Sequence, residues 1–292
     1  MLNGIHGHQD IERVVYGRPA GTAVRAEAER LGAKRVFVTT TKSVAQSALL
    51  ADVIKELGDR YAGVYAGISD ARHGIKESFG HRLIVPRVIV LDPAATLATP
   101  MDLMLSTGLK AVDHAVERLC SQQANPFALG TSTEALKLLT SALPAHKENS
   151  DDREARMNLQ FGMWLSIGAG TSGVGVGASH GIGHVLGAAC HVPHGHTSCV
   201  MLPSVLRWNL PANADRQKRV SEAFGKPDVP AADLVANLVA TLGLPGRLSE
   251  VGVGKDRFRE IAEKSMHDRA VLNNPRPIKG PAEVMEILEL AA

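Results

Sequence analysis

Hydrophobic positions change their spacing about a third of the way along the chain. Up to about residue 96, short runs of β-branched and apolar residues alternate with segments of helical periodicity. A strand, a helix and a second strand follow one another at short intervals here, which predicts a βαβ unit with a parallel sheet. The predicted strands cover 12–17, 35–40, 60–67 and 85–93, with helices over 22–32 and 44–57.

The periodicity is helical from residue 97 to the end of the chain. Helices are predicted over 101–122, 126–143, 151–174, 176–190, 197–208, 213–224, 230–242, 255–266 and 281–290. The pattern therefore predicts an α/β fold over residues 1–96 and an all-α domain over residues 97–292.

Composition narrows the class of protein. The 292 residues are 45% hydrophobic and 21% charged, with a formal net charge of +2, so nothing favours a nucleic-acid partner. Aromatic residues make up only 4%, which argues further against base stacking. The cysteines Cys120, Cys190 and Cys199 lack CxxC spacing and are interpreted as reduced thiols. Without an apolar N-terminal run or a membrane-length segment, we expect a cytoplasmic protein with no membrane contact.

Five of the twelve histidines fall between residues 180 and 196. His180 and His184 are spaced i, i+4 and share one face of a helix, while His194 lies just beyond Pro193. Imidazole groups bind metals, transfer protons and stabilise oxyanions near neutral pH. The alternative is a surface helix that happens to be rich in histidine, but the small apolar residues around His184 favour a buried helix.

Two other places carry candidate chemistry. On the helix over 101–122, Lys110 and His114 share a face at i, i+4, while Asp113 and Glu117 are expected to point elsewhere. A single histidine on an apolar face is more often a core residue than a ligand, but the other histidines strengthen a functional interpretation. Thr39, Thr40 and Thr41 end a predicted parallel strand, so they either contact a phosphate or nicotinamide group or simply form a polar strand end.

The glycines between 168 and 177 superficially resemble a dinucleotide fingerprint. No predicted strand precedes them and no acidic residue follows at the right distance, so we reject that interpretation. We expect these glycines to allow close helix packing or a backbone approach to a ligand. The run His180-Gly181-Ile182-Gly183-His184 also lacks the glutamate of the zinc-protease motif.

Several motifs together resemble one family. They are Asp92-Pro93 with Thr96 and Pro100, Ser106-Thr107-Gly108 with His114-Ala115-Val116-Glu117, Ala124-Asn125-Pro126, the histidine stretch through Pro193-His194-Gly195, and Asn274-Pro275-Arg276-Pro277. Over almost its whole length the chain resembles the iron-containing alcohol dehydrogenase superfamily, and within it the maleylacetate reductase-like branch.

The resemblance implies a dinucleotide-binding α/β domain, a helical domain and an active site between them. The family holds a divalent metal, iron or zinc, with one aspartate and three histidines. The matching histidines are His114, His180 and His194, and Lys110 stands at the aspartate position. Maleylacetate reductase-like relatives also depart from the acidic ligand and work without a tightly held metal. In that case His114, His180, His184 or Lys110 would polarise the carbonyl and supply the proton, with His184 nearest the substrate and nicotinamide.

A second departure lies in the nucleotide-binding half. The family's Gly-Gly-Gly-Ser turn, which binds the cofactor pyrophosphate, and a later Thr-Thr segment are both missing from this sequence. The chain passes from residues 62–67 directly to the family's later segment at 68–79. We therefore expect a truncated Rossmann-like domain with weakened cofactor binding, exposed sheet edges and exposed apolar surface.

The resemblance implies an NAD(P)H-dependent oxidoreductase that transfers hydride to a keto acid or another carbonyl substrate. Small-molecule substrates, a role in the catabolism of aromatic compounds and a homodimer follow from the same resemblance. The alternative is a truncated relative that has lost dinucleotide binding and is impaired in catalysis or non-enzymatic.

Overall fold

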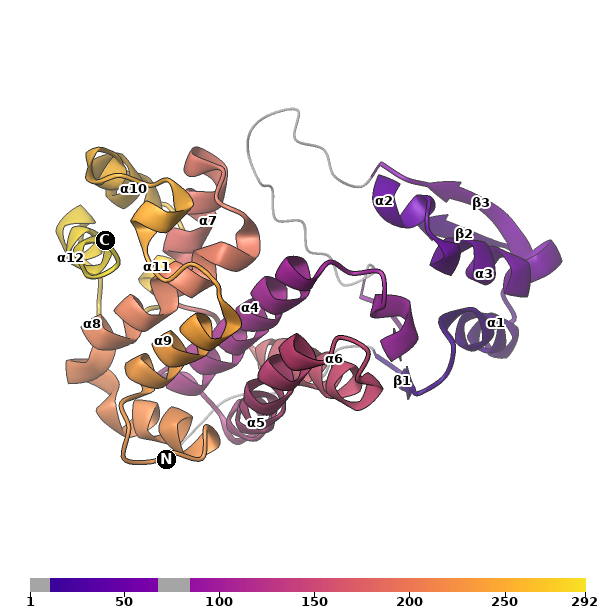
Figure 1. Cartoon of the computed structure of the whole chain (residues 1–292), viewed down its shortest axis with the longest axis horizontal. Helices are drawn as coiled ribbons and strands as arrows, with labels where there is room; N and C mark the ends of the chain where they lie inside the picture. The colour runs from indigo at the N-terminus through magenta and orange to yellow at the C-terminus, as the bar shows by residue number, and fades with distance from the viewer. Residues whose placement is uncertain (1–10, 68–84) are drawn as a thin grey trace. The chain divides into compact units, whose positions relative to one another are not determined.

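The computed structural model describes residues 11–67 and 85–292 (Figure 1). The described chain forms two compact units, one of residues up to Ala98 and one from Thr99 to Ala292. The segment 68–79, which was predicted to match the family's later segment, lies outside the described residues.

The smaller unit contains the predicted parallel strands. Val36–Thr39 (β2) pairs in parallel with Tyr61–Tyr65 (β3), and the helices between them complete the predicted βαβ unit. Arg13–Tyr16 (β1) pairs in parallel with Val88–Leu91 (β4). The remaining elements are Ala20–Arg30 (α1), Lys42–Ala45 (α2), Ala48–Leu57 (α3) and the 3-10 turns Gly58–Arg60 (η1) and Pro93–Thr96 (η3).

The single helix predicted over 44–57 is wrong, because the segment forms α2 and α3. Thr41 caps the start of α2 by accepting a hydrogen bond from the Val44 N–H. Ser47 does the same for Leu50 at the start of α3. Serine and threonine hydroxyls compete with helical hydrogen bonding, so Ser47 favours a new helix start over continuation.

The sheet surface of the smaller unit is poorly covered. Among the described residues β1–β4 and β2–β3 are separate two-stranded sheets. Large side chains on these strands are exposed, with Tyr16 at 62%, Phe37 at 59% and Tyr65 at 55%. Such sheets normally bury both faces under helices. The exposure agrees with the apolar surface expected from the shortened nucleotide-binding half.

The larger unit is built from helices. They are Met101–Cys120 (α4), Pro126–Glu148 (α5), Arg153–Gly168 (α6), Ala178–Cys190 (α7), His194–Ala223 (α8), Ala231–Leu242 (α9), Phe258–Ser265 (α10), Arg269–Leu272 (α11) and Pro281–Leu290 (α12), with 3-10 turns Ala169–Ser172 (η4), Leu248–Val251 (η5) and Lys255–Arg257 (η6). The predicted all-α character of this region is confirmed.

Some predicted boundaries in this unit are wrong. The helix predicted to stop at 143 continues through Pro144 to Glu148. The helix predicted to begin at 197 begins at His194, and the break predicted between 197–208 and 213–224 is present as a kink with non-helical backbone at Asn213. The Gln217 amide bridges the kink, because its Nε2 donates to the Leu206 carbonyl at 2.7 Å and to Asn213 Oδ1 at 2.9 Å. Side-chain hydrogen bonds of this kind satisfy groups that a kink frees.

Helix α4 is the centre of the larger unit. Leu109, Val112, Val116 and Leu119 are fully buried in one core cluster with side chains from α5, α8 and α9. A Cβ added at Gly108 would lie 2.4 Å from a methyl group of Leu143, so the glycine allows α5 to approach α4 closely. Burial on several sides leaves few positions on α4 that face solvent, and polar residues there must find partners inside the protein.

A second core cluster lies under α7, α10 and α12 and contains Ile182, Leu186, Phe258 and Ile287. Helix α7 is therefore a buried helix on one side, and the alternative of a histidine-rich surface helix is wrong. In the described chain no helix is both long enough and apolar enough to cross a membrane. All three cysteines are free.

Candidate active site

The structure brings the predicted histidines together. His114 lies on α4, His180 and His184 lie on α7, and His194 is the first residue of α8. The ring centroids of His114 and His180 are 4.2 Å apart, and those of His180 and His184 are 6.3 Å apart. The His184 and His194 rings stack with centroids 6.3 Å apart. These four residues and Lys110 are called the histidine cluster below.

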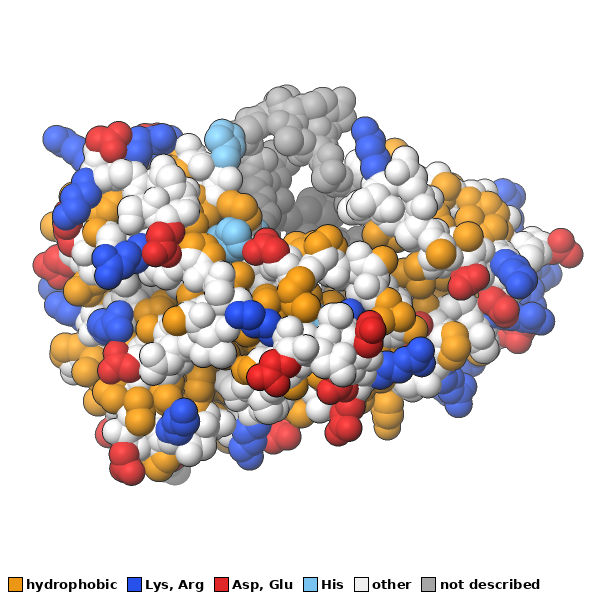
Figure 2. All heavy atoms as spheres, viewed as in Figure 1, with side chains coloured by type: hydrophobic (Ala, Val, Ile, Leu, Met, Phe, Trp, Pro, Cys, Tyr) orange, Lys and Arg blue, Asp and Glu red, His pale blue; other side chains and the backbone are white. Residues whose placement is uncertain are grey.

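The cluster extends from the core to the surface. His180 is 2% exposed, whereas the His184 side chain is 41% exposed. In Figure 2, histidine side chains reach the surface of the larger unit over the region of α7 in Figure 1. His184 is therefore the member of the α7 pair that a dissolved ligand reaches most easily.

Hydrogen bonds fix the ring of His180. Its Nδ1 lies 2.8 Å from Glu117 Oε2, and a carboxylate only accepts, so the Nδ1 carries the proton and donates. In the neutral ring the Nε2 then holds a lone pair, and it faces His114 Nε2 at 3.3 Å. In the hydrogen bond between the two rings, His114 Nε2–H therefore donates to His180 Nε2.

His114 is held neutral. Burial lowers its pKa far below the ordinary value, and the neighbouring His180, Arg118, Lys110 and His194 lower it further. Its Nδ1 is buried and has no hydrogen-bond partner among the described residues. At neutral pH His114 therefore acts as a hydrogen-bonding group and not as a cation.

Glu117 connects α4 to the start of α7. Its carboxylate accepts hydrogen bonds from the backbone N–H groups of Gly177 at 2.8 Å, Ser179 at 2.8 Å and His180 at 3.4 Å. The first N–H groups of a helix lack partners within the helix, and the helix dipole favours an anion beside them. A Cβ at Gly177 would lie 3.0 Å from Glu117 Oε1. The predicted role of this glycine run in close packing is confirmed at Gly177.

Asp113 forms the second buried carboxylate of the site. Its Oδ2 accepts hydrogen bonds from Ser179 Oγ at 2.9 Å and Ser198 Oγ at 2.5 Å. The Lys110 ammonium lies 3.7 Å from the same oxygen, and Lys110 is only 5% exposed. This buried ion pair needs its hydroxyl partners, because each charge loses hydration inside the protein.

The expectation that Asp113 and Glu117 point away from the site is wrong. Both contact His180, at 3.4 Å for Asp113 and 2.8 Å for Glu117. On α4 these two carboxylates do not share a face with His114, which is why they were expected to lie elsewhere. Helices α7 and α8 both contact α4, however, and supply partners to Asp113 and Glu117 as well. The sequence signal that was missed is a pair of carboxylates at i, i+4 among the apolar positions of this helix.

The outer histidine has its own carboxylate. His184 Nδ1 lies 2.8 Å from Oδ2 of Asp268, the residue before α11. Burial acts to raise the pKa of Asp268, but hydrogen bonds from His184 and from the Ala270 N–H outweigh it and lower the pKa below its ordinary value. Asp268 is therefore ionised at neutral pH.

The donor set does not fit the family's four-ligand metal centre. The 3.3 Å between His114 Nε2 and His180 Nε2 matches one edge of a tetrahedral site, about 3.3 Å for metal–nitrogen bonds of about 2.0 Å. At the position that the resemblance gives to the fourth ligand, however, the sequence has Lys110, whose ammonium has no lone pair and brings a positive charge. The ligand atoms of Asp113, Glu117 and His180 also lie within 4.8 Å of one another. Most of those atoms already hold backbone N–H or hydroxyl partners, so a metal there would displace existing hydrogen bonds.

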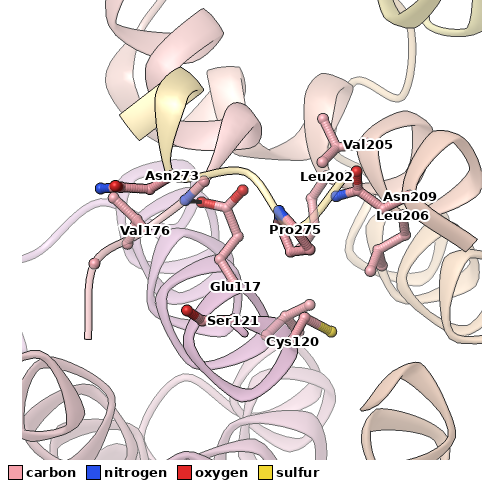
Figure 3. A pocket seen from close by; sticks show the side chains of 13 residues that line it. Glu117, Cys120, Ser121, Val176, Leu202, Val205, Leu206, Asn209, Asn273 and Pro275 are labelled. Atoms are coloured by element: carbon pink, nitrogen blue, oxygen red, sulfur yellow. Dashed lines mark hydrogen bonds between the residues drawn. The ribbon is translucent and has the colours of Figure 1, made fainter. Parts of the chain in front are cut away.

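Glu117 also lines a small pocket (Figure 3). Glu117, Ser121, Asn209 and Asn273 supply its polar groups, and Cys120 with Leu202 and Leu206 are among its apolar ones. Its volume of about 10 Å³ accommodates roughly one water molecule. The pocket is too small for a substrate.

The predicted nucleotide contacts lie in the smaller unit. Thr39 ends β2, the Thr40 N–H donates to the Tyr65 carbonyl at 2.9 Å, and Thr41 caps α2. Since β2 and β3 are parallel and Thr39 pairs with Tyr65, the three threonines lie at the carboxyl-terminal edge of this sheet. Their contact with a nucleotide stays a prediction.

Comparison with known proteins identifies the family. Residues 104–292 match the model of the Fe-containing alcohol dehydrogenase family, C-terminal. Maleylacetate reductase 1 of Cupriavidus pinatubonensis is 26% identical over 333 residues, covering 92% of each chain. This alignment is longer than the 292 residues here, so the relative has residues that this chain lacks, in agreement with the predicted deletion.

Two further relatives support the assignment. Maleylacetate reductase of Burkholderia cepacia is 31% identical over 273 residues, covering 88% of this chain and 74% of the relative. A putative alcohol dehydrogenase crystal structure from Ralstonia eutropha JMP134 has a TM-score of 0.89 at 26% identity, covering 100% of this chain and 98% of that one. No finding favours the non-enzymatic alternative. The chain therefore belongs to the Fe-containing alcohol dehydrogenase family, within its maleylacetate reductase-like branch, and is an oxidoreductase.

Proposed function

We propose that the protein reduces the carbonyl group of a keto acid with NAD(P)H and does so without a bound divalent metal. The observation that carries this proposal is the buried Lys110 ammonium, which pairs with Asp113 next to His180. By resemblance, Lys110 matches the position of the family's acidic ligand. A fixed positive charge in a site of low dielectric stabilises a developing alkoxide, as a metal ion does in related enzymes. The relatives from Cupriavidus and Burkholderia are called maleylacetate reductases, so maleylacetate is the first substrate to test.

In the proposed reaction the nicotinamide supplies a hydride to the carbonyl carbon. Lys110 stabilises the negative charge that develops on the carbonyl oxygen. His184 donates the proton to that oxygen, because its ring is the exposed one of the α7 pair and its Nδ1 is already engaged by Asp268. His180, which is buried, and His114, which is half-buried, are held in place by the hydrogen bonds from His180 to Glu117 and between the two rings.

The nucleotide would bind at the edge formed by Thr39, Thr40 and Thr41. Parallel sheets bind ligands outside the carboxyl ends of their strands, which is where these residues lie. Without the Gly-rich turn, fewer backbone N–H groups are available for the pyrophosphate, so the affinity is expected to be lower than is usual for such enzymes.

The protein is expected to bind NADH weakly and to oxidise it when maleylacetate is present. Fluorescence titration should saturate with a Kd of about 1 mM, roughly 4 kcal/mol of binding free energy. The NADH absorbance should then fall in a maleylacetate-dependent manner in buffer containing EDTA. A fluorescence signal that shows no curvature at NADH concentrations well above that Kd contradicts the proposal, and so does a rate that EDTA abolishes and added Fe²⁺ or Zn²⁺ restores.

His184→Asn is expected to lower kcat by about 10²–10⁴-fold, the usual contribution of a positioned proton donor. The KM for NADH should change little, because the substitution removes no proposed nucleotide contact. His191→Asn is the matched control directly after the same helix, since His191 is exposed and has the left-handed conformation that asparagine tolerates. Equal steady-state kinetics for the two variants would rule out His184 as the proton donor.

A further inference from the structure

We propose that Asp268 is the positioning residue of the active site, and that Gly181 makes its position possible. The inference rests on the proposed role of His184 as proton donor. Asp268 itself does not contact the substrate and acts only through His184. It holds the His184 ring so that Nε2, on the opposite side of the ring from Nδ1, is the nitrogen left for the substrate.

The two carboxylate oxygens of Asp268 have separate partners. Oδ2 accepts from His184 Nδ1 at 2.8 Å, and Oδ1 accepts from the Ala270 N–H at 2.8 Å as the cap of α11. The carbonyl of Asp268 also accepts from the Val271 N–H at 3.1 Å. The carboxylate is thus fixed by the backbone of α11 before it meets the histidine, and an acceptor fixed in this way restricts the rotation of the ring.

Gly181 determines how closely α11 approaches α7. A Cβ added there would lie 2.5 Å from Cγ2 of Val271 and 2.9 Å from its backbone nitrogen. The backbone atom has no rotamer by which to move away, so any larger residue must push α11 outward. Gly181 stands three residues before His184, and positions i and i+3 share a face of a helix. The glycine therefore lies on the side of α7 from which the carboxylate reaches the imidazole.

This contact fixes the chemical form of His184. With Nδ1–H donating to the carboxylate, the neutral ring has its lone pair on Nε2 and the protonated ring has its transferable proton there. In the reduction, the Nε2–H bond breaks as the substrate O–H bond forms, and the electron pair of the N–H bond stays on Nε2. His184 ends neutral, still donating Nδ1–H to Asp268. In the opposite tautomer His184 would no longer donate to Asp268, the carboxylate that it contacts among the described residues, so that tautomer is unfavourable here.

The tautomer is measured directly by ¹⁵N NMR of the His184 side chain in the full-length protein. The wild type should show the neutral ring protonated at Nδ1. In Asp268→Asn the new amide caps Ala270 through its oxygen and donates through its nitrogen, so the proton of the neutral ring should move to Nε2. Asp268→Ser keeps a capping hydroxyl but is too short to reach His184, and should give a mixture of both tautomers.

Kinetics supply the second measurement. Asp268→Asn should lower kcat by about 10–100-fold, the usual effect of losing an outer hydrogen-bond partner, while the KM for NADH stays within about twofold. Gly181→Ala should reduce both the Nδ1–H signal and kcat, since it displaces α11. Gly187→Ala is the control on the same helix, because its added Cβ would meet only the Val192 carbonyl at 3.7 Å, an ordinary contact.

Failure of the inference and failure of the proposed function are distinguishable. An active wild type whose His184 is protonated at Nε2, or an Asp268→Asn variant with wild-type kcat, overturns the role of Asp268. An inactive wild type with the Nδ1–H tautomer overturns the proposed reaction and leaves the Asp268–His184 contact in place. A Gly181→Ala variant that keeps the wild-type tautomer and rate refutes the role of the glycine alone.

Discussion

Lys110→Asp is expected to convert the histidine cluster into a metal-binding site. The variant places a carboxylate beside His114, His180 and His194 and so completes one acidic and three imidazole ligands. It also removes the ammonium, which would repel a divalent cation. Elemental analysis after dialysis against Zn²⁺ and then metal-free buffer should give about one zinc per chain for the variant, and far less for the wild type.

The stability of this variant should depend on the metal. Without it, the new carboxylate lies near Asp113 and has lost the ammonium, so two buried like charges destabilise the site. With Zn²⁺ at about 1,000 times its Kd, binding stabilises the fold by about 4 kcal/mol, visible as a higher Tm. Lys110→Met is the control: it removes the charge without adding a ligand, should bind no metal and should lower kcat by about 10²–10³-fold. Stoichiometric zinc in the wild type would contradict the metal-free proposal.

Glu117→Ala is expected to destabilise the helical unit by about 3–5 kcal/mol. The substitution leaves the N–H groups of Gly177 and Ser179 and the Nδ1–H of His180 without their acceptor inside the protein. It also removes the negative charge that the start of α7 favours. Urea unfolding at pH 7 measures the loss. Glu117→Gln should cost less, about 1–3 kcal/mol, because one acceptor oxygen remains.

Glu134→Ala is the matched control for this measurement. Glu134 is 54% exposed on α5, and its ion pair within the described part of the chain is with Lys137 at 3.6 Å, so its loss should change the free energy of unfolding by less than about 1 kcal/mol. If Glu117→Ala is as stable as this control, the Glu117 carboxylate does not hold α7 in place. The same comparison separates loss of a buried anchor from a general effect of removing a carboxylate.

The regular parts of the fold could be predicted because their signals are local. The strands around Val36 and Val88 follow from β-branched runs, and the long helices of the larger unit follow from apolar periodicity and caps such as Asn125. The break in α8 at Asn213 lies where the predicted helices 197–208 and 213–224 were separated. The Gln217 amide that reaches back across it to the Leu206 carbonyl is not encoded in the periodicity. Short elements such as α11 have too few residues for a periodic signal.

In the site, too, the features with a local signal could be predicted and those that depend on helix packing could not. His180 and His184 could be paired from their spacing on one helix, and His114 and His194 were candidates from the sequence that the resemblance then grouped with them. Their carboxylate partners could not be derived, because Glu117 lies 63 residues before His180 and Asp268 lies 84 residues after His184. Helical spacing says which side chains share a face of one helix, but not which faces of other helices will meet it.

The Glu117 anchor also has a consequence for how the protein acquires activity. The carboxylate and the N–H groups that it binds are about 60 residues apart in the chain, and Asp113 is 85 residues from Ser198. Closing such long loops costs entropy that is recovered only when the helices have docked. The site therefore assembles late, and a partly folded chain would have helices but no ordered histidine cluster. Regain of reductase activity after dilution from urea would then report completed docking of α4, α7 and α8. Circular dichroism measures helix content and would not detect this step.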